Sequence, residues 1–306
     1  MKTIPLDPSL EALLRDYEHY CCAVAGLATS TCALRLWRAR LFLADLSTRG
    51  PVVLSQLSAP VVVGYLTEAE ASSPGGPLAS LASAVRCFLR FLHVRGYLPL
   101  PLDQSVPRVA HPATDPPPKY LTPAQLDQLL GATDRQGAEG RRDYAILLCL
   151  ARLGMRAGEV AHLCLGDVNW PQSCLQLPHT KGQRTGLLPL PQPVGAALVA
   201  YLRRERPRTA LPQLFVSADE PPRAMTSNSV SKVVKRALAR AGLWAPSQGA
   251  HLLRHTLATH LVQKGASLKA VADLLRHRQL QTTGIYAKVN QPMLAEVAQP
   301  WPEVGS

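Results

Sequence analysis

Residues 251–289 read HLLRHTLATHLVQKGASLKAVADLLRHRQLQTTGIYAKV, and this stretch decides the fold of the C-terminal half. Its apolar residues recur every three or four positions, which predicts helices over 250–264 and 268–276 and a short helix into Tyr286. Between the apolar residues stand side chains capable of proton transfer or phosphate binding: His251, Arg254, His277 and Tyr286. We therefore expect a mainly α-helical unit whose helices bring such groups together.

The helical period continues upstream, with one strand region. Helices are predicted over 143–153, from near Arg156, over 193–204 and over 226–241. Another begins after Thr122, because a threonine N-cap, Pro123 at the first position and Gln125 form a capping box. Two apolar runs, 174–179 and 185–190, flank a glycine-containing turn and predict a β-hairpin with Lys181 at its tip.

The N-terminal part predicts four helices, over 9–22, 29–46, 58–71 and 78–95. One face of the fourth helix is apolar, and another carries Arg86 and Arg90. This basic face could lie on a DNA backbone, or it could be an ordinary solvated surface. Five prolines within residues 105–120 predict an extended connector, and we place the boundary between two domains there.

The net charge of +12 is unevenly distributed. Residues 1–105 carry nine Lys or Arg and eight Asp or Glu, whereas residues 106–306 carry 24 and 13. Residues 221–272 hold eight basic residues, among them Lys232, Lys235 and Arg236, and no acidic one. A polyanion is the natural partner of such a surface, although a solvated basic face has the same composition.

Composition argues against several classes of protein. With 47% apolar and 18% charged residues, the chain can bury ordinary globular cores. Seven cysteines without a Cys-x-x-Cys pattern argue against a disulfide framework and a zinc site. We find no secretory signal and no apolar run long enough for a membrane span, so we expect a cytoplasmic protein that enters no membrane.

Two pairs of side chains have the same helical spacing. Arg156 and Glu159 would share one face, where the carboxylate can orient the guanidinium, although a surface ion pair looks the same. His251 and Arg254 repeat this spacing, and an arginine presents a planar fork that fits two phosphate oxygens. His255 and His260 are also available, so composition does not single out His251, and each of these histidines could be structural.

Tyr286 is the predicted nucleophile. A free tyrosine has a pKa of about 10, so attack at neutral pH requires a base and positive surroundings. The nearby arginines, lysine and imidazoles could provide both, and the cations would also stabilise a pentacoordinate phosphorus. Taken alone, Tyr286 could equally be a packed tyrosine with its hydroxyl facing outward.

Together these residues resemble the tyrosine recombinases, also called the phage integrase family. His251-x-x-Arg254, Leu275-Arg276-His277 and a tyrosine nine residues later carry the resemblance, which covers nearly the whole chain. The resemblance implies a mainly α fold: a four-helix, SAM-like core-binding domain over 1–105, a linker over 106–119, and a mostly helical catalytic domain with a small β-sheet or hairpin over 120–306.

The resemblance also implies a role for each residue. Arg156 and Arg254 would clamp the scissile phosphate, with Glu159 supporting Arg156. His251 and His277 would complete the hydrogen bonding, and His251 would be the acid/base partner of the tyrosine.

Strand cleavage would follow from these roles. Lys181 would protonate the departing 5′ oxygen, and Tyr286 would attack to leave a 3′-phosphotyrosyl link. No metal or nucleotide cofactor would be needed. Expected partners are double-stranded DNA, further copies of the chain in a homotetramer on two DNA sites, and accessory recombinases, at the nucleoid.

Two motifs depart from the family pattern, and the C-terminal tail leaves an alternative open. Arg276 stands where the family usually has glycine, and Leu153-Gly154-Met155-Arg156 replaces the commoner Thr-Gly-Leu-Arg. The tail after Tyr286 contains a short apolar helix candidate, which resembles an element that docks on a neighbouring protomer but could also fold back on its own domain.

We expect a site-specific recombinase, with mobile-element integration, excision or transposition preferred over Xer-type chromosome or plasmid dimer resolution. A type IB topoisomerase shares the chemistry, and a requirement for paired sites would distinguish the two. A catalytically silent DNA-binding accessory protein is the rival from another class, but such a protein would be expected to lack a reacting group. A helix-turn-helix repressor fits less well, because the charge is spread over a large domain.

Overall fold

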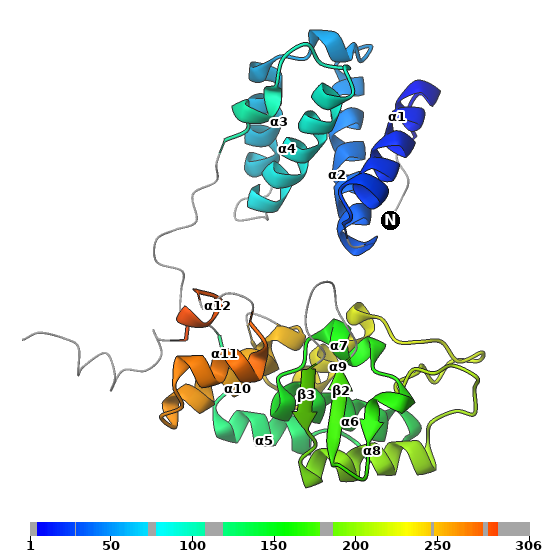
Figure 1. The fold of residues 1–306 in the computed structure, drawn as a ribbon, viewed down its shortest axis with the longest axis vertical. Helices are drawn as coiled ribbons and strands as arrows, with labels where there is room; N and C mark the ends of the chain where they lie inside the picture. The colour runs from blue at the N-terminus through cyan, green and yellow to red at the C-terminus, as the bar shows by residue number, and fades with distance from the viewer. Residues whose placement is uncertain are drawn as a thin grey trace, which may run out of the picture. The chain divides into compact units, whose positions relative to one another are not determined.

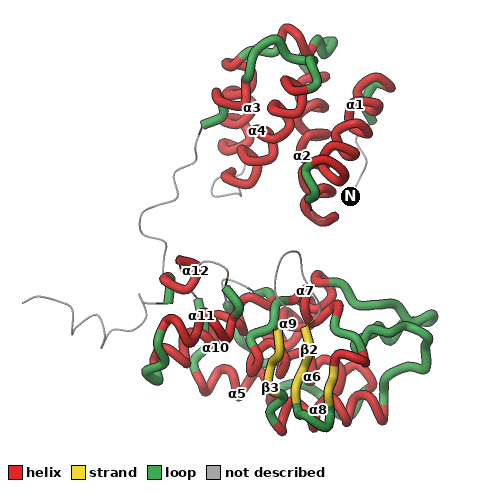
Figure 2. Tube along the Cα trace, viewed as in Figure 1, coloured by secondary structure: helices red, strands yellow, loops and turns green. Residues whose placement is uncertain are grey.

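The computed structural model describes residues 5–27, 29–72, 78–107, 119–177, 186–245, 248–277 and 281–286. Contacts between residues divide the chain into two compact units, Met1–Ala113 and Thr114–Ser306. Helices occur in both units, and strands occur in the second (Figures 1 and 2). The division falls within the proline-rich segment expected to be the linker, of which residues 108–118 lie outside the described part.

All regular elements in the described residues of the first unit are helices or helical turns. Its elements are α1 (Pro8–His19), the π-helical turn η1 (Tyr20–Val24), α2 (Thr29–Thr48), the 3₁₀ turn η2 (Leu54–Gln56), α3 (Ala59–Ser72), α4 (Leu78–Val94) and the 3₁₀ turn η3 (Leu102–Ser105). The four predicted helices are confirmed, and their ends lie within three residues of the predicted ones.

Aromatic side chains fill the core of the first unit. The ring of Tyr17 in α1 meets the edge of Phe88 in α4, with 4.9 Å between ring centroids, and Phe42 of α2 contacts Tyr65 of α3 at 5.0 Å. Tyr17, Phe42 and Phe88 are fully buried. Such edge contacts add to the burial of apolar area, so all four helices share one core.

The second unit combines eight helices with a small sheet in its described residues. The helices are α5 (Pro123–Gly131), α6 (Ala138–Leu153), α7 (Ala157–His162), α8 (Gln192–Arg204), α9 (Ser227–Arg240), α10 (Ala250–Gln263), α11 (Leu268–Leu275) and α12 (Gln281–Gly284). The remaining elements are the 3₁₀ turn η4 (Leu165–Asp167) and the strands β1 (Val168–Asn169), β2 (Cys174–Leu177) and β3 (Gly186–Pro189).

The three strands form an antiparallel sheet in the order β1-β2-β3. Leu175 of β2 pairs with Val168 of β1 and with Leu188 of β3. The predicted antiparallel pairing of β2 with β3 is confirmed, whereas β1 was not predicted because two residues are too short to show a strand period. Lys181, expected at the hairpin tip, lies outside the described residues.

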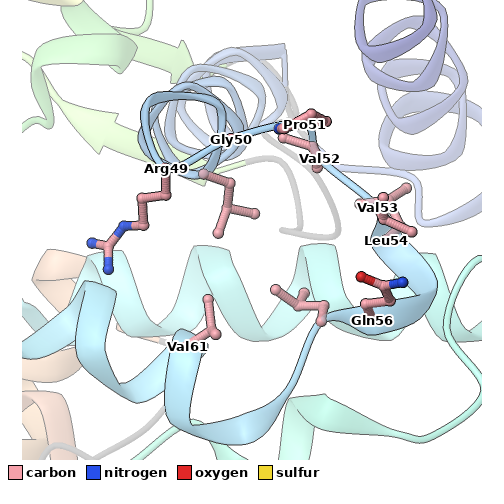
Figure 3. Close-up of a pocket in the computed structure, with 10 residues that line it drawn as sticks. Arg49, Gly50, Pro51, Val52, Val53, Leu54, Gln56 and Val61 are labelled. Carbon is pink, nitrogen blue, oxygen red and sulfur yellow. The ribbon is translucent and has the colours of Figure 1, made fainter.

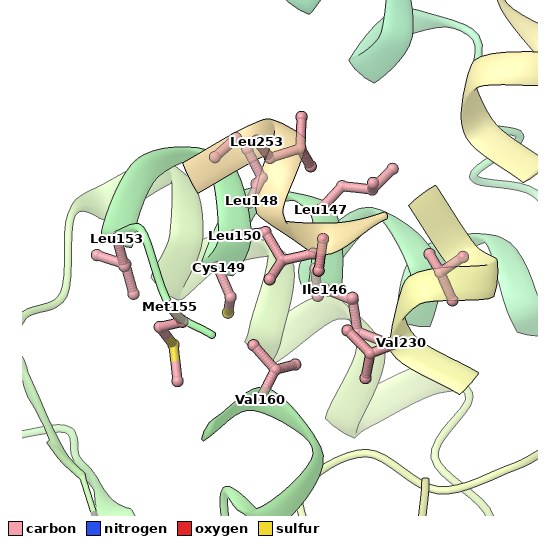
Figure 4. Close-up of a cluster of buried hydrophobic side chains, with 14 of the residues drawn as sticks. Ile146, Leu147, Leu148, Cys149, Leu150, Leu153, Met155, Val160, Val230 and Leu253 are labelled. Carbon is pink, nitrogen blue, oxygen red and sulfur yellow. The ribbon is translucent and has the colours of Figure 1, made fainter. Parts of the chain in front are cut away.

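Helix α6 passes through the core of the second unit and packs against helices α7, α9 and α10 (Figure 4). Fully buried side chains of α6 pack with Val160 of α7, Val230 of α9 and Leu253 of α10. Met155, which follows the end of α6, is also fully buried. Arg156 follows Met155, Glu159 precedes Val160, and Arg254 follows Leu253. The packing of the core therefore fixes the backbone that carries these three expected site residues.

The predicted capping box at the start of α5 is confirmed. Gln125 N–H donates to Thr122 Oγ1 at 3.2 Å, and Thr122 N–H donates to Gln125 Oε1 at 2.9 Å. Both backbone polar groups of Leu121, the residue before the cap, contact side chains of α10. The Leu121 N–H donates to Thr256 Oγ1 at 3.0 Å, and the Leu121 carbonyl oxygen lies 2.9 Å from His260 Nε2. This histidine therefore has a structural partner.

No helix in the described ranges is long and apolar enough to cross a membrane. The seven cysteines all lie within these ranges, and no disulfide joins them.

Candidate active site

Arg254 occupies the centre of the candidate site. It lies on α10 and is 3% exposed, and its guanidinium donates to the carbonyl oxygens of Gly154 and Leu275. These residues end α6 and α11, where helix carbonyls lack a partner within their own helix. Burial, together with the charge of Arg156, lowers the pKa of Arg254 to about 10, which still leaves it a cation at pH 7.

Gly154 allows these three helices to meet. It closes α6 in the left-handed conformation, with φ of 59°. A Cβ at this position would lie 2.7 Å from Leu275 Cδ2 and 3.0 Å from Leu257 Cδ2. A side chain here would strain the backbone and push against two leucine side chains, and the glycine carbonyl accepts a hydrogen bond from Arg254.

Arg156 and Glu159 form the expected pair at the start of α7. Arg156 N–H donates to Glu159 Oε2 at 2.8 Å, and its Nη1 donates to Oε1 at 2.7 Å. Glu159 is buried, which favours its neutral form, but the Arg156 N–H and the charges of Arg276 and Arg156 outweigh burial and lower its pKa. The carboxylate therefore stays ionised and fixes the direction of the guanidinium.

Arg276, the departure from the family pattern, joins this pair. Its Nη2 donates to Glu159 Oε2 at 2.7 Å, and its carbonyl accepts from Arg156 Nη2 at 3.3 Å. Its backbone is left-handed, with φ of 54°, at the end of α11. One buried carboxylate thus holds two arginines, one of which extends the cationic cluster beyond the expected residues.

Tyr286 is buried, and its hydroxyl contacts a histidine. The residue is 1% exposed, and its Oη lies 2.7 Å from His255 Nδ1. Burial raises the pKa of Tyr286 to about 12, although the charge of Arg254 acts in the opposite direction. The resemblance assigns the acid/base role to His251, whereas the imidazole that contacts the hydroxyl here belongs to His255.

His251 and His277 lie in the field of the same arginines. Burial lowers the pKa of both, followed by the charges of Arg254 and Arg156, and the pKa of His277 falls to about 4. His277 Nδ1 is 2.7 Å from Thr283 Oγ1 in α12. Both imidazoles are therefore mainly neutral near pH 7, and a neutral imidazole has one ring N–H that can donate to a phosphate oxygen.

The structure thus brings together most of the residues expected from the sequence. Those in the described part are Arg156, Glu159, His251, Arg254, His277 and Tyr286. The expectation from the sequence did not assign roles to His255 and Arg276. A signal for His255 was present, because residues 251 and 255 are four apart and lie on one face of a helix.

The arginines expected to contact DNA from α4 have partners within their own unit. Arg86 Nη2 donates to the carbonyls of Val106 and Pro107 at 3.2 and 3.1 Å. Arg90 Nη2 donates to Asp103 Oδ2 at 3.1 Å, and its side chain is 62% exposed. Both therefore fasten residues 103–107 to α4, and contact of either with DNA stays a prediction.

Among the expected DNA contacts on α9, Lys232 and Lys235 are exposed, and neither has an ion pair within the described ranges. Arg236 donates to Asp143 Oδ2 at 2.8 Å and keeps 44% of its side chain exposed. A phosphate could reach all three side chains, so a role in DNA contact stays a prediction for each.

A pocket in the first unit has no comparable chemistry. It lies between the end of α2, the loop over residues 50–57 and the start of α3, and apolar side chains line most of it (Figure 3). Arg49 is the titratable residue of its lining, and this guanidinium is paired with Asp45 at 3.1 Å and Glu68 at 2.5 Å. The candidate active site therefore lies in the second unit.

Comparison with known proteins identifies the family. The family model described as "Phage integrase family" matches residues 119–292, which is more than half of the chain and spans the candidate site. The chain belongs to the phage integrase family. Within this family of tyrosine recombinases, the matched range includes every residue of the candidate site.

Similar members of the phage integrase family include proteins named integrase/recombinase in Sinorhizobium fredii. One of these, y4rF, is 36% identical over 304 residues, which are 96% of this chain and 72% of y4rF. Another, y4rA, is 36% identical over 254 residues, and the match spans 62% of its length. Tyrosine recombinase XerD of Listeria monocytogenes is 27% identical over 292 residues, covering 93% of this chain and 96% of XerD.

Solved structures in the phage integrase family share the fold. XerH, solved on its palindromic difH substrate, aligns over 95% of this chain and 85% of its own, with a TM-score of 0.73 and 20% identity. A lambda integrase dimer bound to a COC′ core site aligns over 96% and 98%, with a TM-score of 0.68 and 15% identity. At such identities the likeness establishes the fold.

Proposed function

We propose that this chain is a site-specific DNA recombinase that cuts and rejoins strands through Tyr286. The observation that carries the proposal is a cluster of two arginines and three imidazoles around Arg254, in which His255 contacts the Tyr286 hydroxyl. Phosphodiester transfer requires cations for the phosphate oxygens, a nucleophile and proton carriers, and these residue types are the ones assembled here.

In this reaction Tyr286 Oη attacks the scissile phosphorus and expels the 5′ oxygen of the next nucleotide. Arg254 and Arg156 hold the non-bridging oxygens, and their orientation is fixed in advance by helix-end carbonyls and by Glu159. Lys181 protonates the departing oxygen. The bond energy is kept in the 3′-phosphotyrosyl link, so a free 5′ hydroxyl can rejoin the strand by the reverse reaction.

The first unit acts in this proposal as the core-binding domain that holds DNA together with the second unit. Two DNA sites and four copies of the chain make the full complex, with the tail after Tyr286 joining protomers. The names of the relatives support recombination, and the integrase/recombinase names favour movement of a mobile element over dimer resolution.

The experiment that tests the proposal is covalent trapping on a nicked duplex carrying the sequences at the ends of the element that encodes the chain. A nick just beyond the scissile phosphate lets the cleaved fragment diffuse away, so the adduct accumulates. We expect a shifted band on a denaturing gel, attached to a DNA 3′ end, for the natural chain and not for Tyr286→Phe.

The matched control is a mobility-shift assay, in which both proteins should bind the same duplex equally. Tight binding without an adduct would instead support the catalytically silent accessory protein. An adduct formed by Tyr286→Phe would contradict the choice of nucleophile.

A further inference from the structure

Two histidines of α10 face the candidate site, and they stand in different relations to Tyr286. His255 Nδ1 is 2.7 Å from Tyr286 Oη, and the two ring centroids are 5.7 Å apart. His251 lies one turn earlier, with its ring centroid 6.1 Å from that of His255. The imidazole within hydrogen-bond distance of the attacking atom is therefore that of His255.

We propose that His255 is the base that accepts the phenolic proton of Tyr286 during strand cleavage and returns it during rejoining. This inference rests on the proposed function and assigns a step within it. His251 then remains free to bond the phosphate beside Arg254.

The bond from Tyr286 Oη to phosphorus forms while the bond from phosphorus to the 5′ oxygen breaks, and its electron pair leaves with that oxygen. The phenolic proton passes to His255 Nδ1, and a separate acid, Lys181, supplies a proton to the 5′ oxygen. Rejoining reverses each transfer.

Tyr286 needs such a base because its own ionisation is rare. With a pKa of about 12, roughly one phenol in 10⁵ is ionised at pH 7. A positioned base removes this requirement by taking the proton as the new bond forms, which typically contributes a factor of about 10² to 10⁴.

The surroundings of His255 keep its imidazole ready to accept a proton. Burial lowers the pKa of His255, followed by the charges of His251 and Arg254 on the same helix. From the neighbouring elements, His277 after α11 and Tyr286 after α12 also face it. A neutral imidazole with its proton on Nε2 leaves the Nδ1 lone pair directed at the phenol.

Helix α10 also fixes the base relative to the phosphate clamp. His255 directly follows Arg254, whose guanidinium is bonded to the ends of α6 and α11. The next residue, Thr256, accepts from the Leu121 N–H at 3.0 Å and is fully buried. A base next to an anchored arginine keeps its position when DNA enters, which general-base catalysis requires.

The test is single-turnover cleavage of the nicked duplex from pH 5 to pH 9 by the natural chain, His255→Asn and His251→Asn. An asparagine at position 255 can accept the hydrogen bond but cannot take a proton. His260→Asn is the matched control, because His260 lies on the same helix and bonds the Leu121 carbonyl outside the site.

We expect His255→Asn to bind DNA normally and to cleave about 10² to 10³ times more slowly at pH 7. The fall in rate of the natural chain at low pH, caused by protonation of the base, should disappear in this variant. His251→Asn should keep that fall, and His260→Asn should match the natural chain in both rate and pH profile.

A second substrate distinguishes the loss of a general base from the loss of a general acid. When sulfur replaces the bridging 5′ oxygen, the leaving group no longer needs a proton, so loss of the acid is rescued and loss of the base is not. We expect no rescue of His255→Asn.

Rescue by sulfur, a rate within threefold of the natural chain, or faster cleavage by His255→Asn would each overturn the role of His255 as the base and leave the recombinase proposal intact. Absence of an adduct from the natural chain would instead count against the proposed function itself.

Discussion

Arg276 shows how a side chain can hold a backbone conformation that glycine adopts more easily. It ends α11 with φ of 54°, and the following N–H, that of His277, donates to the Ala272 carbonyl at 3.0 Å. Glycine is common at such a helix end because it has no Cβ to clash. Here the guanidinium bonds Glu159 and the arginine carbonyl bonds Arg156, so the side chain ties the end of α11 to the start of α7.

Replacing Arg276 by glycine and by alanine distinguishes the effect of its backbone conformation on stability from the effect of its side chain. Both variants lose the bond to Glu159, but only alanine keeps a Cβ in the left-handed conformation. We expect Arg276→Gly to be more stable to urea than Arg276→Ala by about 1 kcal/mol. Equal free energies of unfolding for the two variants would mean that position 276 does not hold this conformation.

At the residue scale, the sequence pointed to most of the chemistry, but composition did not rank the histidines, and the family resemblance favoured His251. His251 fits a spacing that the sequence displays, since it lies three residues before Arg254. His255 gains its importance from a contact with a residue 31 positions later, and that contact depends on how α10 and α12 pack. Spacing along one helix carries no information about such a contact.

At the element scale, the site depends on where helices end. Helices α6 and α11 end against α10, and their last carbonyls receive the donors of Arg254. Unpaired carbonyls at a helix end favour a cation, so the same arrangement stabilises the fold and orients the phosphate clamp.

Gly154→Ala tests this dependence. Alanine would require a positive φ and would place a Cβ 2.7 Å from Leu275 Cδ2, so the Leu275 side chain must shift. We expect a loss of about 1 to 3 kcal/mol in the free energy of unfolding, measured with urea. Cleavage should fall by more than the folded fraction explains, because the carbonyl that anchors Arg254 is displaced.

Gly166→Ala is the control for that variant, since its Cβ would meet nothing within 4 Å and its φ is not positive. Similar losses in the two variants would argue that Gly154 is an ordinary loop glycine.

Most helix boundaries were predicted to within three residues, and the start of α6 is an exception. Thr122 and Gln125 satisfy orphan backbone groups from within four residues, so their capping box was visible in the sequence. Helix α6 begins five residues before its predicted start, because Glu139 and Arg142 make its first turns polar and interrupt the apolar period. Those turns are stabilised by ion pairs instead.

At the scale of the whole molecule, charge is divided between the two units. The first is nearly neutral, whereas the second carries most of the excess of Lys and Arg. Inside the second unit, burial and, after it, the charge of the arginine cluster lower the pKa of three histidines. In the folded unit these three imidazoles are therefore mainly neutral at pH 7.

Stability should consequently depend on pH below neutrality. Unfolded histidines titrate at about 6.5, whereas burial and the arginines lower the folded pKa of His277 to about 4. Between these values the unfolded chain binds more protons, so acid favours unfolding. We expect the free energy of unfolding to fall between pH 7 and pH 5, as measured by urea titration.

The matched variant is His277→Asn, which removes one of the three groups and should show a smaller fall. Glu159, whose pKa is lowered, loses its stabilising charge only at lower pH and does not contribute in this window. A fall of the same size in His277→Asn would exclude His277 as a source of the pH dependence of the free energy of unfolding.

The sequence by itself determined the helices, the strand pair and the residue types of the site, because apolar period, capping residues and side-chain chemistry are local properties. Tertiary structure alone decided which histidine meets Tyr286, why Arg276 occupies a position suited to glycine, and how Arg254 is anchored. Each of these depends on contacts between residues from 21 to 117 positions apart. Such contacts form only when the ends of α6, α7, α10, α11 and α12 pack together.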